Sequence, residues 1–240
     1  MIFKHDYNIV LSMLSQNNNI SNKGFLSILQ DTAEMHSASI GLGVTDVYKT
    51  NFSWALLNWK LKFFSRAKYG ETITVSTWIS HYTKLFCYRD FEVTNSNGEV
   101  IAIATSKWVL LNTLGGRVSK LDEEIVQKYQ PEQRSVFDIT EVDKLQDPQN
   151  YSYSTDYKVK KSEIDVNNHV NNLCYLDIAL EVYPESTNTF NSCTELEILY
   201  KHQIKIDDKI TAYYTCQNGE NYVTIKSNEG SVLHSIIKFQ

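Results

Sequence analysis

The stretch WALLNWKLKFFSRAKYGETITVSTW (54–78) carries the clearest strand pattern in this chain of 240 residues. Trp59, Leu61 and Phe63 alternate with lysines, and a second alternating run follows a turn signal at residues 69–71. Successive side chains of a strand point to opposite faces of its sheet, so this period of two is typical of half-buried strands. The stretch therefore predicts two strands of an antiparallel sheet.

Similar strand patterns fill two separate parts of the chain. In the first part they continue from residue 85 to 93 and from 100 to 111. In the second part, residues 194–239, four such patterns follow one another with Asp-, Asn- or Gly-containing turn signals between them. Strands joined by short turns pair as antiparallel neighbours, so each part predicts an antiparallel meander.

A helical pattern precedes each group of strands. Residues 22–40 place apolar side chains three and four positions apart, and Ser21 or Asn22 can cap this helix. The second helix is expected at residues 171–183, and Pro184 should end it.

The order of a helix followed by strands therefore occurs twice, which suggests a duplication. Laying residues 59–75 over residues 196–212, a shift of 137, aligns Ile73 with Ile210. We predict an α+β fold of two modules, each with a helix wrapped by its own antiparallel sheet. Pairing of the two sheets edge to edge would make one continuous sheet and cover two exposed edges.

The predicted boundaries follow from composition. The first module covers residues 1–135, a linker richer in polar and charged residues covers 136–150, and the second module covers 151–240. A short helix is expected near residues 122–129.

Composition excludes several classes of function. A formal net charge of −5 argues against general nucleic-acid binding. The longest apolar runs are far short of the roughly 20 residues that a membrane-spanning helix needs, so no membrane insertion is expected. Four widely spaced cysteines form no CxxC pair, which argues against a structural zinc site and indicates reduced thiols in a cytoplasmic protein. Neither a metal nor another cofactor is expected.

The run DVNNHVNN (165–172) is the strongest candidate for a chemical site. In an extended segment, Asp165, Asn167 and His169 would share one face while the two valines point inward. A carboxylate can activate water, an amide can stabilise an oxyanion, and an imidazole can assist proton transfer. The competing interpretation is an Asn-rich turn and helix cap with a partly exposed histidine.

DVNNHVNNLCYLD (165–177) resembles the D-x-N-x-H-V-N-N-x-x-Y motif of the acyl-[acyl-carrier-protein] thioesterases of plants and bacteria. The first half is similar to that family too, in FLSILQDTAEMHSASIGLG (25–43), in residues 54–78 and in ATSKWVLLNTLGGRVSKL (104–121). The resemblance implies a tandem hotdog fold, in which the second module carries the catalytic residues and the first mainly recognises the acyl chain.

The resemblance also implies roles for single residues. Asp165 matches the catalytic carboxylate, Asn167 the residue that holds the thioester carbonyl or positions the nucleophile, and His169 the catalytic histidine. The plant enzymes carry a further Glu and an adjacent Cys, and at those positions this chain has Gln203 and Ile204. A glutamine is no general base, so Asp165 must then carry the base or nucleophile role, with Glu195 and Glu197 as minor alternatives.

Several other side chains have less specific expectations. Trp59, Leu29 and Ala33 are weak candidates for contacts with the acyl chain, because such pockets are mostly apolar. His36 is expected to be a core histidine. Five cations are expected on solvated strand positions, a minority of which could dock an acidic carrier: Lys60, Lys62, Arg66, Lys68 and Arg89.

The resemblance implies hydrolysis of fatty acyl thioesters of acyl carrier protein in fatty acid biosynthesis, with the carrier protein as partner. The same chemistry on acyl-coenzyme A and a non-catalytic acyl-binding module are the alternatives, and a homodimer is left open. A hotdog enoyl hydratase also uses Asp and His, but the HVNN pattern fits it less well.

Overall fold

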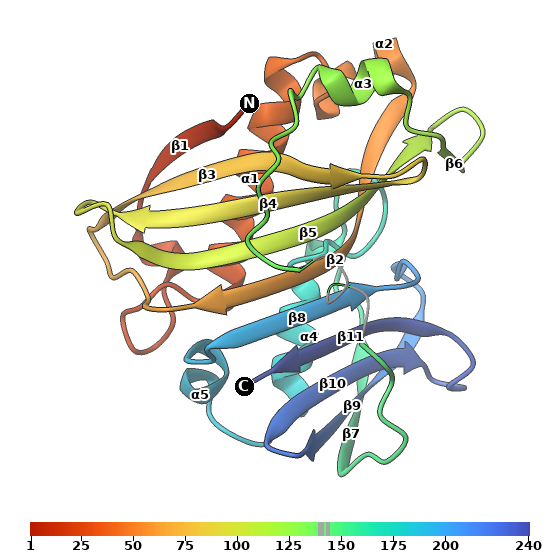
Figure 1. The fold of residues 1–240 in the computed structure, drawn as a ribbon. Coiled ribbons are helices and arrows are strands. Elements are labelled where there is room, and N and C mark those ends of the chain that lie inside the picture. Colours follow the sequence, from red (N-terminus) through yellow and green to blue (C-terminus); the bar gives the residue numbers. More distant parts are fainter. Residues whose placement is uncertain (139–141, 143–144) are drawn as a thin grey trace.

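The computed structural model describes residues 1–138, 142 and 145–240. Within these residues, eleven strands form one sheet in the order β1-β3-β4-β5-β2-β8-β11-β10-β9-β7, with β6 paired to β5 (Figure 1). The first module contributes β1 (Phe3–Asn8), β2 (Phe52–Phe63), β3 (Thr72–Tyr82), β4 (Phe86–Asn95), β5 (Val100–Asn112) and β6 (Arg117–Ser119). The second contributes β7 (Tyr153–Lys158), β8 (Glu195–Tyr200), β9 (Lys209–Gln217), β10 (Glu220–Ser227) and β11 (Leu233–Phe239).

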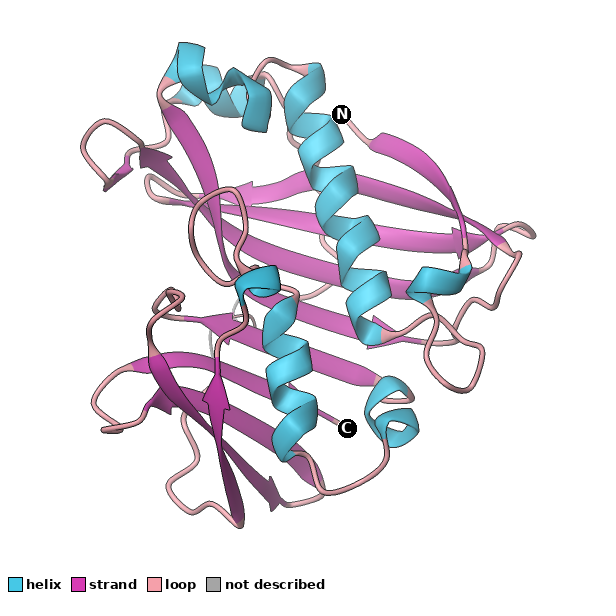
Figure 2. Cartoon of the chain, turned by 180° about the vertical axis from the view of Figure 1, so that it is seen from behind, coloured by secondary structure: helices cyan, strands magenta, loops and turns pink. Residues whose placement is uncertain are grey.

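Two main helices lie side by side on one face of this sheet, as Figure 2 shows from behind. They are α1 (Asn22–Ser39) and α4 (Cys174–Val182). The shorter helices are η1 (Leu11–Met13), η2 (Val44–Asp46), α2 (Val47–Thr50), α3 (Glu123–Gln127), η4 (Lys161–Glu163) and α5 (Thr187–Asn191). The predicted double hotdog, with one continuous antiparallel sheet and helices on it, is confirmed.

The predicted meanders are wrong in one strand of each module. β2 pairs with β5 and not with β3, and β8 pairs with β11 and not with β9. The connectors that follow β2 and β8 in the sequence each contain eight residues, 64–71 and 201–208, which is too long for a tight hairpin. Each of these strands instead lies at the inner edge of its module, where β2 and β8 pair with each other.

The outer strands β1 and β7 were not predicted. Their side chains are largely exposed, with Tyr157 the one buried residue of β7, so neither strand has the alternation that marks a half-buried strand. β1 pairs with β3, and β7 pairs with β9.

The junction between the modules confirms the register of the duplication. In the antiparallel pairing of β2 with β8, Lys60 lies opposite Glu197. These two positions are related by the shift of 137, so an approximate twofold axis passes between them. A chain with two such modules thereby reproduces the closed, isologous contact of a symmetric dimer.

Local chemistry explains where α1 begins. The Ser21 hydroxyl accepts a hydrogen bond from the Gly24 backbone N–H at 3.0 Å, which caps the helix. Gly24 is needed because a Cβ there would lie 2.5 Å from the Met13 carbonyl oxygen. Phe25, Ile28 and Leu29 are fully buried, so α1 contributes one apolar face to a core shared by both modules.

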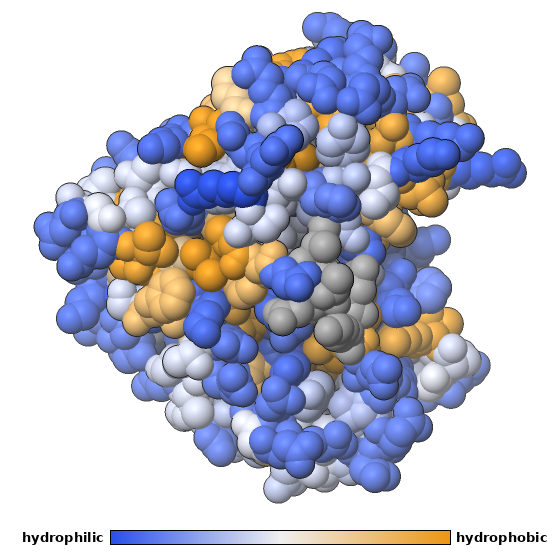
Figure 3. Space-filling model, in the orientation of Figure 1, coloured by the Kyte–Doolittle hydropathy of each residue, from blue (hydrophilic) through white to orange (hydrophobic). Residues whose placement is uncertain are grey.

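The opposite face of the sheet is largely hydrophilic, with apolar side chains gathered in patches (Figure 3). Among the described residues, no helix has the length and apolar character needed to cross a membrane.

Candidate active site

The loop at residues 165–170 joins η4 to α4 and is closed at its base by a bridge between Ile164 and Val170. The Asp165 backbone N–H donates to the His169 carbonyl at 2.9 Å, and the Asn168 N–H donates to the Asp165 carbonyl at 3.0 Å. Asn168 has φ 61°, the left-handed conformation that Asn tolerates better than most residues. The segment is therefore a closed turn, and the predicted extended segment is wrong.

This geometry corrects the predicted alternation of faces. Val166 is 85% exposed at the tip of the turn, whereas Val170 is buried as expected. The Asn167 backbone N–H donates to Asp165 Oδ1 at 2.8 Å, so this carboxylate oxygen stabilises the turn. Among the described residues, no hydrogen bond reaches Asp165 Oδ2, so the half-buried carboxylate keeps one oxygen for other partners.

The imidazole of His169 is half-buried. Its Nδ1 is shielded from solvent and has no hydrogen-bond partner within the described part of the chain. A buried polar atom of this kind usually has a partner, so Nδ1 is available to a bound water or ligand. Asn167, by contrast, is exposed.

Gln203 follows β8 in the sequence, within the connector of residues 201–208, and its side chain is exposed. The Val170 backbone N–H donates to the Ile204 carbonyl at 2.8 Å, which holds this connector against the loop. Gln203 is thus adjacent to the residue that the loop binds.

Glu163, Cys174 and Asp177 flank the loop in the sequence and were not predicted as part of the site. Cys174 is the first residue of α4, and burial, together with the charges of Asp177, Glu163 and Asp165, raises the pKa of its thiol. This thiol stays protonated at neutral pH and is a poor nucleophile. The buried Glu163 carboxylate accepts hydrogen bonds from the Tyr157 hydroxyl and the Lys160 backbone N–H. These contacts give Glu163 a structural role, which is to cap η4.

A charged contact joins the two modules beside the loop. Lys23 Nζ on α1 lies 2.5 Å from Asp177 Oδ2 on α4. The positive charge of Lys23 partly offsets the rise in the pKa of the Cys174 thiol. Asp165, Glu163, Asp177 and Lys23 therefore form one electrostatic environment around the start of α4. No residue pattern in the sequence predicted a contact between positions so far apart.

The first module contains the same loop at residues 15–20. The Ser15 N–H donates to the Asn19 carbonyl at 2.8 Å, the Asn18 N–H donates to the Ser15 carbonyl at 3.2 Å, and Asn18 also has φ 61°. Its Ile20 N–H donates to the Ala67 carbonyl at 2.8 Å, as Val170 does to Ile204. A shift of 150 relates the loops, so Ser15 stands where the second module has Asp165, and Asn19 where it has His169.

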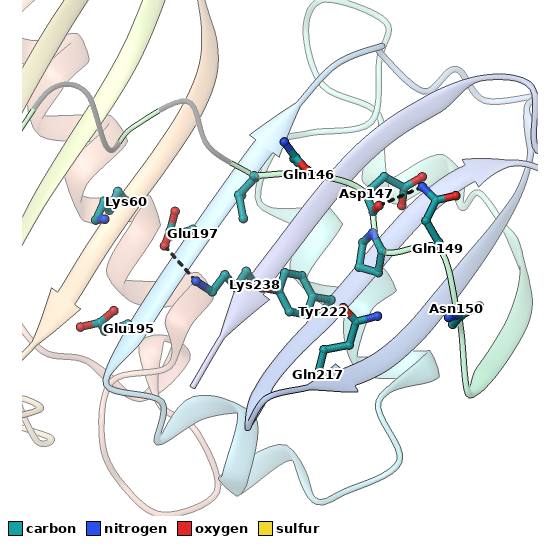
Figure 4. A pocket seen from close by; sticks show the side chains of 12 residues that line it. Lys60, Gln146, Asp147, Gln149, Asn150, Glu195, Glu197, Gln217, Tyr222 and Lys238 are labelled. Atoms are coloured by element: carbon teal, nitrogen blue, oxygen red, sulfur yellow. Dashed lines mark hydrogen bonds and ion pairs between the residues drawn. The ribbon is translucent and has the colours of Figure 1, made fainter.

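The minor alternatives for the acid lie on the wrong face of the sheet. On β8, Leu196, Ile198 and Tyr200 point into the core, so Glu195 and Glu197 point outward. Lys62 Nζ lies 3.5 Å from Glu195, and Lys238 Nζ lies 3.6 Å from Glu197. Both carboxylates line an open, polar cavity of about 710 Å³ on the outer face of the sheet, below the connector that ends at Asn150 (Figure 4).

A smaller cavity of about 50 Å³ lies inside the first module. Ala33, one of the candidates for acyl contact, lines it together with Trp54, Trp108 and Arg89. The other candidates, Leu29 and Trp59, lie in the core and do not line this cavity.

The prediction of a solvated Arg89 is wrong, since only 4% of this residue is exposed. Arg89 Nη1 lies 2.9 Å from His36 Nδ1 and 3.3 Å from Thr77 Oγ1. His36 is fully buried, as expected, and burial, reinforced by the charge of Arg89, lowers its pKa to about 3. His36 is therefore neutral and accepts through Nδ1. Arg66 is also not the solvated cation expected, because its guanidinium donates to the Cys193 carbonyl at 2.7 Å and packs on Phe63.

Within the described residues, no group of three or more His, Cys, Asp or Glu side chains is arranged to hold a metal ion.

Comparison with known families extends these observations. The model described as the acyl-ACP thioesterase N-terminal domain matches residues 1–129, and that of the acyl-ACP thioesterase C-terminal domain matches residues 146–238. A chloroplastic palmitoyl-acyl carrier protein thioesterase from Gossypium hirsutum is 28% identical over 239 residues, covering 94% of this chain and 58% of the relative. The chain thus spans about three fifths of the length of such curated relatives.

Solved structures share the whole fold. The 12:0-ACP thioesterase from Umbellularia californica superposes with a TM-score of 0.85 at 20% identity, over 100% of this chain and 96% of that one. An acyl-ACP thioesterase from Bacteroides thetaiotaomicron gives a TM-score of 0.81 at 20% identity, over 99% and 96%.

Proposed function

This chain belongs to the acyl-ACP thioesterase family, and we propose that it hydrolyses fatty acyl thioesters of acyl carrier protein to a free fatty acid and the carrier thiol. The proposal assigns the reaction to the loop at residues 165–170, with Asp165 and His169 as its catalytic residues and Asn167 in support. No cofactor or metal takes part in it.

The observation that carries this proposal is the difference between the two equivalent loops. The same turn forms around Ser15 and Asn19 as around Asp165 and His169, with matching backbone hydrogen bonds. The fold therefore requires neither a carboxylate nor an imidazole at these positions. A side chain that the backbone does not need is a candidate for chemistry, and this weighs against a turn and cap alone.

Asp165 Oδ1 is held by the Asn167 N–H, which leaves Oδ2 to act on the substrate. Oδ2 can accept a proton from water as the water oxygen attacks the thioester carbonyl carbon, and the carbon–sulfur bond then breaks. Alternatively, Oδ2 attacks that carbon itself, and water hydrolyses the resulting mixed anhydride. In both routes the leaving thiolate takes a proton, for which the His169 imidazole is the available donor.

Developing charge on the carbonyl oxygen needs hydrogen-bond donors. The Asn167 amide is exposed on the same turn and can supply one. Asn17 occupies the equivalent position of the first module, so this amide distinguishes the two loops less than Asp165 and His169 do. Gln203 cannot act as a base, and its role is limited to orienting water or His169.

Gln203 also motivates the second candidate, an acyl-binding module without catalysis. Binding of an acyl ligand with no thioester cleavage would favour this reading over hydrolysis. A third candidate, hydrolysis of acyl-coenzyme A, is separated by comparing rates on matched carrier-protein and coenzyme A thioesters. We propose a cytoplasmic location, which the four unbridged cysteines support.

The test is a substrate profile with acyl-carrier-protein thioesters of several chain lengths, run beside Asp165→Ala. We expect wild-type turnover of at least one of them and a loss of roughly 1,000-fold or more in the variant, which should still fold and unfold cooperatively although it lacks the hydrogen bond to the Asn167 N–H. Undiminished activity in Asp165→Ala would remove Asp165 from the mechanism. Absence of any turnover by the wild type would remove the hydrolase.

A further inference from the structure

Exposed lysines border the candidate active-site loop on two sides. Six of the 23 basic residues of the chain lie in two short segments, and all six are exposed. We refer to them as the lysine rim: Lys158, Lys160, Lys161, Lys201, Lys205 and Lys209. This concentration stands out in a chain whose net charge is −5.

The two segments lie against the loop and against each other. Lys158 at the end of β7 is the antiparallel partner of Lys209 at the start of β9. The segment 158–163 continues directly into the loop, and the connector 201–208 is held to it by the hydrogen bond from Val170 to Ile204. The lysine rim therefore borders the same loop from two sides.

The equivalent surface of the first module has a different chemistry. Lys160 and Lys161 correspond to Val10 and Leu11 by the shift of 150, and Lys201 corresponds to Phe64 by the shift of 137. These three apolar residues are 44%, 77% and 56% exposed. The registers agree, since Asn8 pairs with Thr72 as Lys158 pairs with Lys209. The backbone therefore accepts apolar side chains here, and the lysines are not required by the fold.

Few carboxylates neutralise the lysine rim. Among the described residues, Lys160 alone has one within 4.0 Å, that of Glu163, which is itself buried. Asp207 and Asp208 share the connector with the lysines, but the Asp208 carboxylate accepts the backbone N–H of Lys205 at 2.8 Å. The five other lysines present charges that no side chain of the described residues pairs with.

We propose that the lysine rim docks the acidic surface of the carrier protein, so that the thioester arm reaches Asp165 and His169. The inference rests on the proposed function and adds to it the place and the chemistry of partner binding. A folded carrier is too large to enter the loop region, so it must sit on the surface beside it. Complementary charge there accelerates encounter and fixes the orientation of the partner.

The test compares two triple variants with the same change of charge. The first reverses the lysine rim with Lys161→Glu, Lys201→Glu and Lys205→Glu. The matched control reverses three exposed lysines of the first module, Lys84→Glu, Lys120→Glu and Lys128→Glu. Each is assayed on an acyl carrier protein thioester and on the same acyl group carried by the small, uncharged thiol N-acetylcysteamine. Binding of the unloaded carrier protein is measured separately by fluorescence anisotropy.

We expect the rim variant to raise KM for the carrier substrate at least about tenfold, with kcat unchanged, because rim charges act mainly on association. The small thioester should be cleaved at the wild-type rate, and the control should match wild type on both substrates. Replacing the same three rim lysines by Gln should give an intermediate rise. Carrier binding by the wild type should weaken as salt is raised, and that dependence should be shallower in the rim variant.

Two results would overturn the proposal. Equal losses on both substrates would mean that the substitutions damage the site and not docking. Unchanged KM and unchanged carrier binding would place the partner elsewhere. If wild type cleaves neither thioester, the hydrolase fails, and the anisotropy measurement still decides whether the lysine rim binds the carrier.

Discussion

The loops at residues 15–20 and 165–170 share a backbone and differ in what they carry. Both close with the same pattern of hydrogen bonds, and both place an Asn at φ 61°. Each loop also donates a backbone hydrogen bond to the connector that follows the inner strand of its module, β2 or β8. The first presents Ser15 and Asn19, and the second presents Asp165 and His169. Folding thus fixes the shape of the loop in each module, whereas the carboxylate and the imidazole are present in the second loop alone.

Transplanting the first loop into the second module tests this separation most directly. Asp165→Ser, Val166→Gln and His169→Asn together give residues 165–169 the sequence of residues 15–19. We expect thioesterase activity to fall by roughly 1,000-fold or more, because both proposed proton-transfer groups are lost. The melting temperature should change by no more than about 4 °C, since the turn already forms with this sequence.

Calorimetry and the carrier thioester assay are the two measurements. An unfolded variant would show that the loops are not interchangeable, and an active one would show that the differing side chains do no chemistry.

His169→Asn is a narrower version of the same exchange. The residue introduced is the one that occupies the equivalent position of the first module, so the turn should be preserved. We expect kcat to fall by about 100-fold, which is typical for loss of one proton-transfer group. Asn19→His in the first module is the matched control, and it should leave kcat unchanged. If His169→Asn kept the full kcat, His169 would have a structural role and no catalytic one.

The histidines of the two modules differ in their surroundings as well. His169 is half-buried and its Nδ1 has no hydrogen-bond partner among the described residues, whereas His36 is fully buried, accepts from Arg89 and stacks on Phe3. The pKa of His36 is lowered from 6.5 to about 3, by burial first and then by the charges of Arg89 and the amino terminus. Between these values the unfolded chain binds a proton that the folded chain does not.

Stability due to His36 is therefore complete above pH 6.5 and falls as pH decreases toward 3, by up to about 1.4 kcal/mol for each pH unit. His36→Asn keeps an acceptor for Arg89 but removes the titration. We expect it to be less stable than wild type at pH 7.5 and to lose less stability on going to pH 5.0. Urea unfolding at the two pH values measures this, with His81→Asn as a control on a surface histidine, and parallel pH slopes in wild type and His36→Asn would contradict it.

The sequence predicted the elements better than their order in the sheet. Alternation identified β2 through β5 and β8 through β11, and the shift of 137 is the register of the junction, where Lys60 faces Glu197. The place of β2 was missed because alternation reports which face is buried and not which strand is adjacent. β1 and β7 were missed because strands that are largely exposed on both faces leave no alternation to read.

The sequence predicted which residues form the candidate loop, but not the backbone conformation of that loop. DVNNHVNN pointed to the right loop, but the left-handed Asn168 turns the chain back, so Val166 is exposed where an extended strand would bury it. The contacts of Arg89 with His36 and of Lys23 with Asp177 join residues 53 and 154 positions apart. Such pairs follow from the fold and leave no local pattern. The roles of Asp165, Asn167, His169 and Gln203 stay predictions.

Asn18 and Asn168 give the smallest expected effect and the sharpest check on the equivalence of the loops. Both adopt φ 61°, a conformation that costs most residues with a Cβ about 1 kcal/mol, costs Asn and Asp less, and is free for Gly. We expect Asn18→Ala and Asn168→Ala each to lower the free energy of unfolding by about 1 kcal/mol, and the Gly variants to stay within about 0.5 kcal/mol of wild type. Chemical denaturation measures all four.

Asn168→Ala should also reduce kcat, because a shifted turn misplaces Asp165, whereas Asn18→Ala should not. Equal effects on stability with unequal effects on kcat are what one backbone with two sets of side chains requires, and a large difference in stability would mean that the two turns are not held alike.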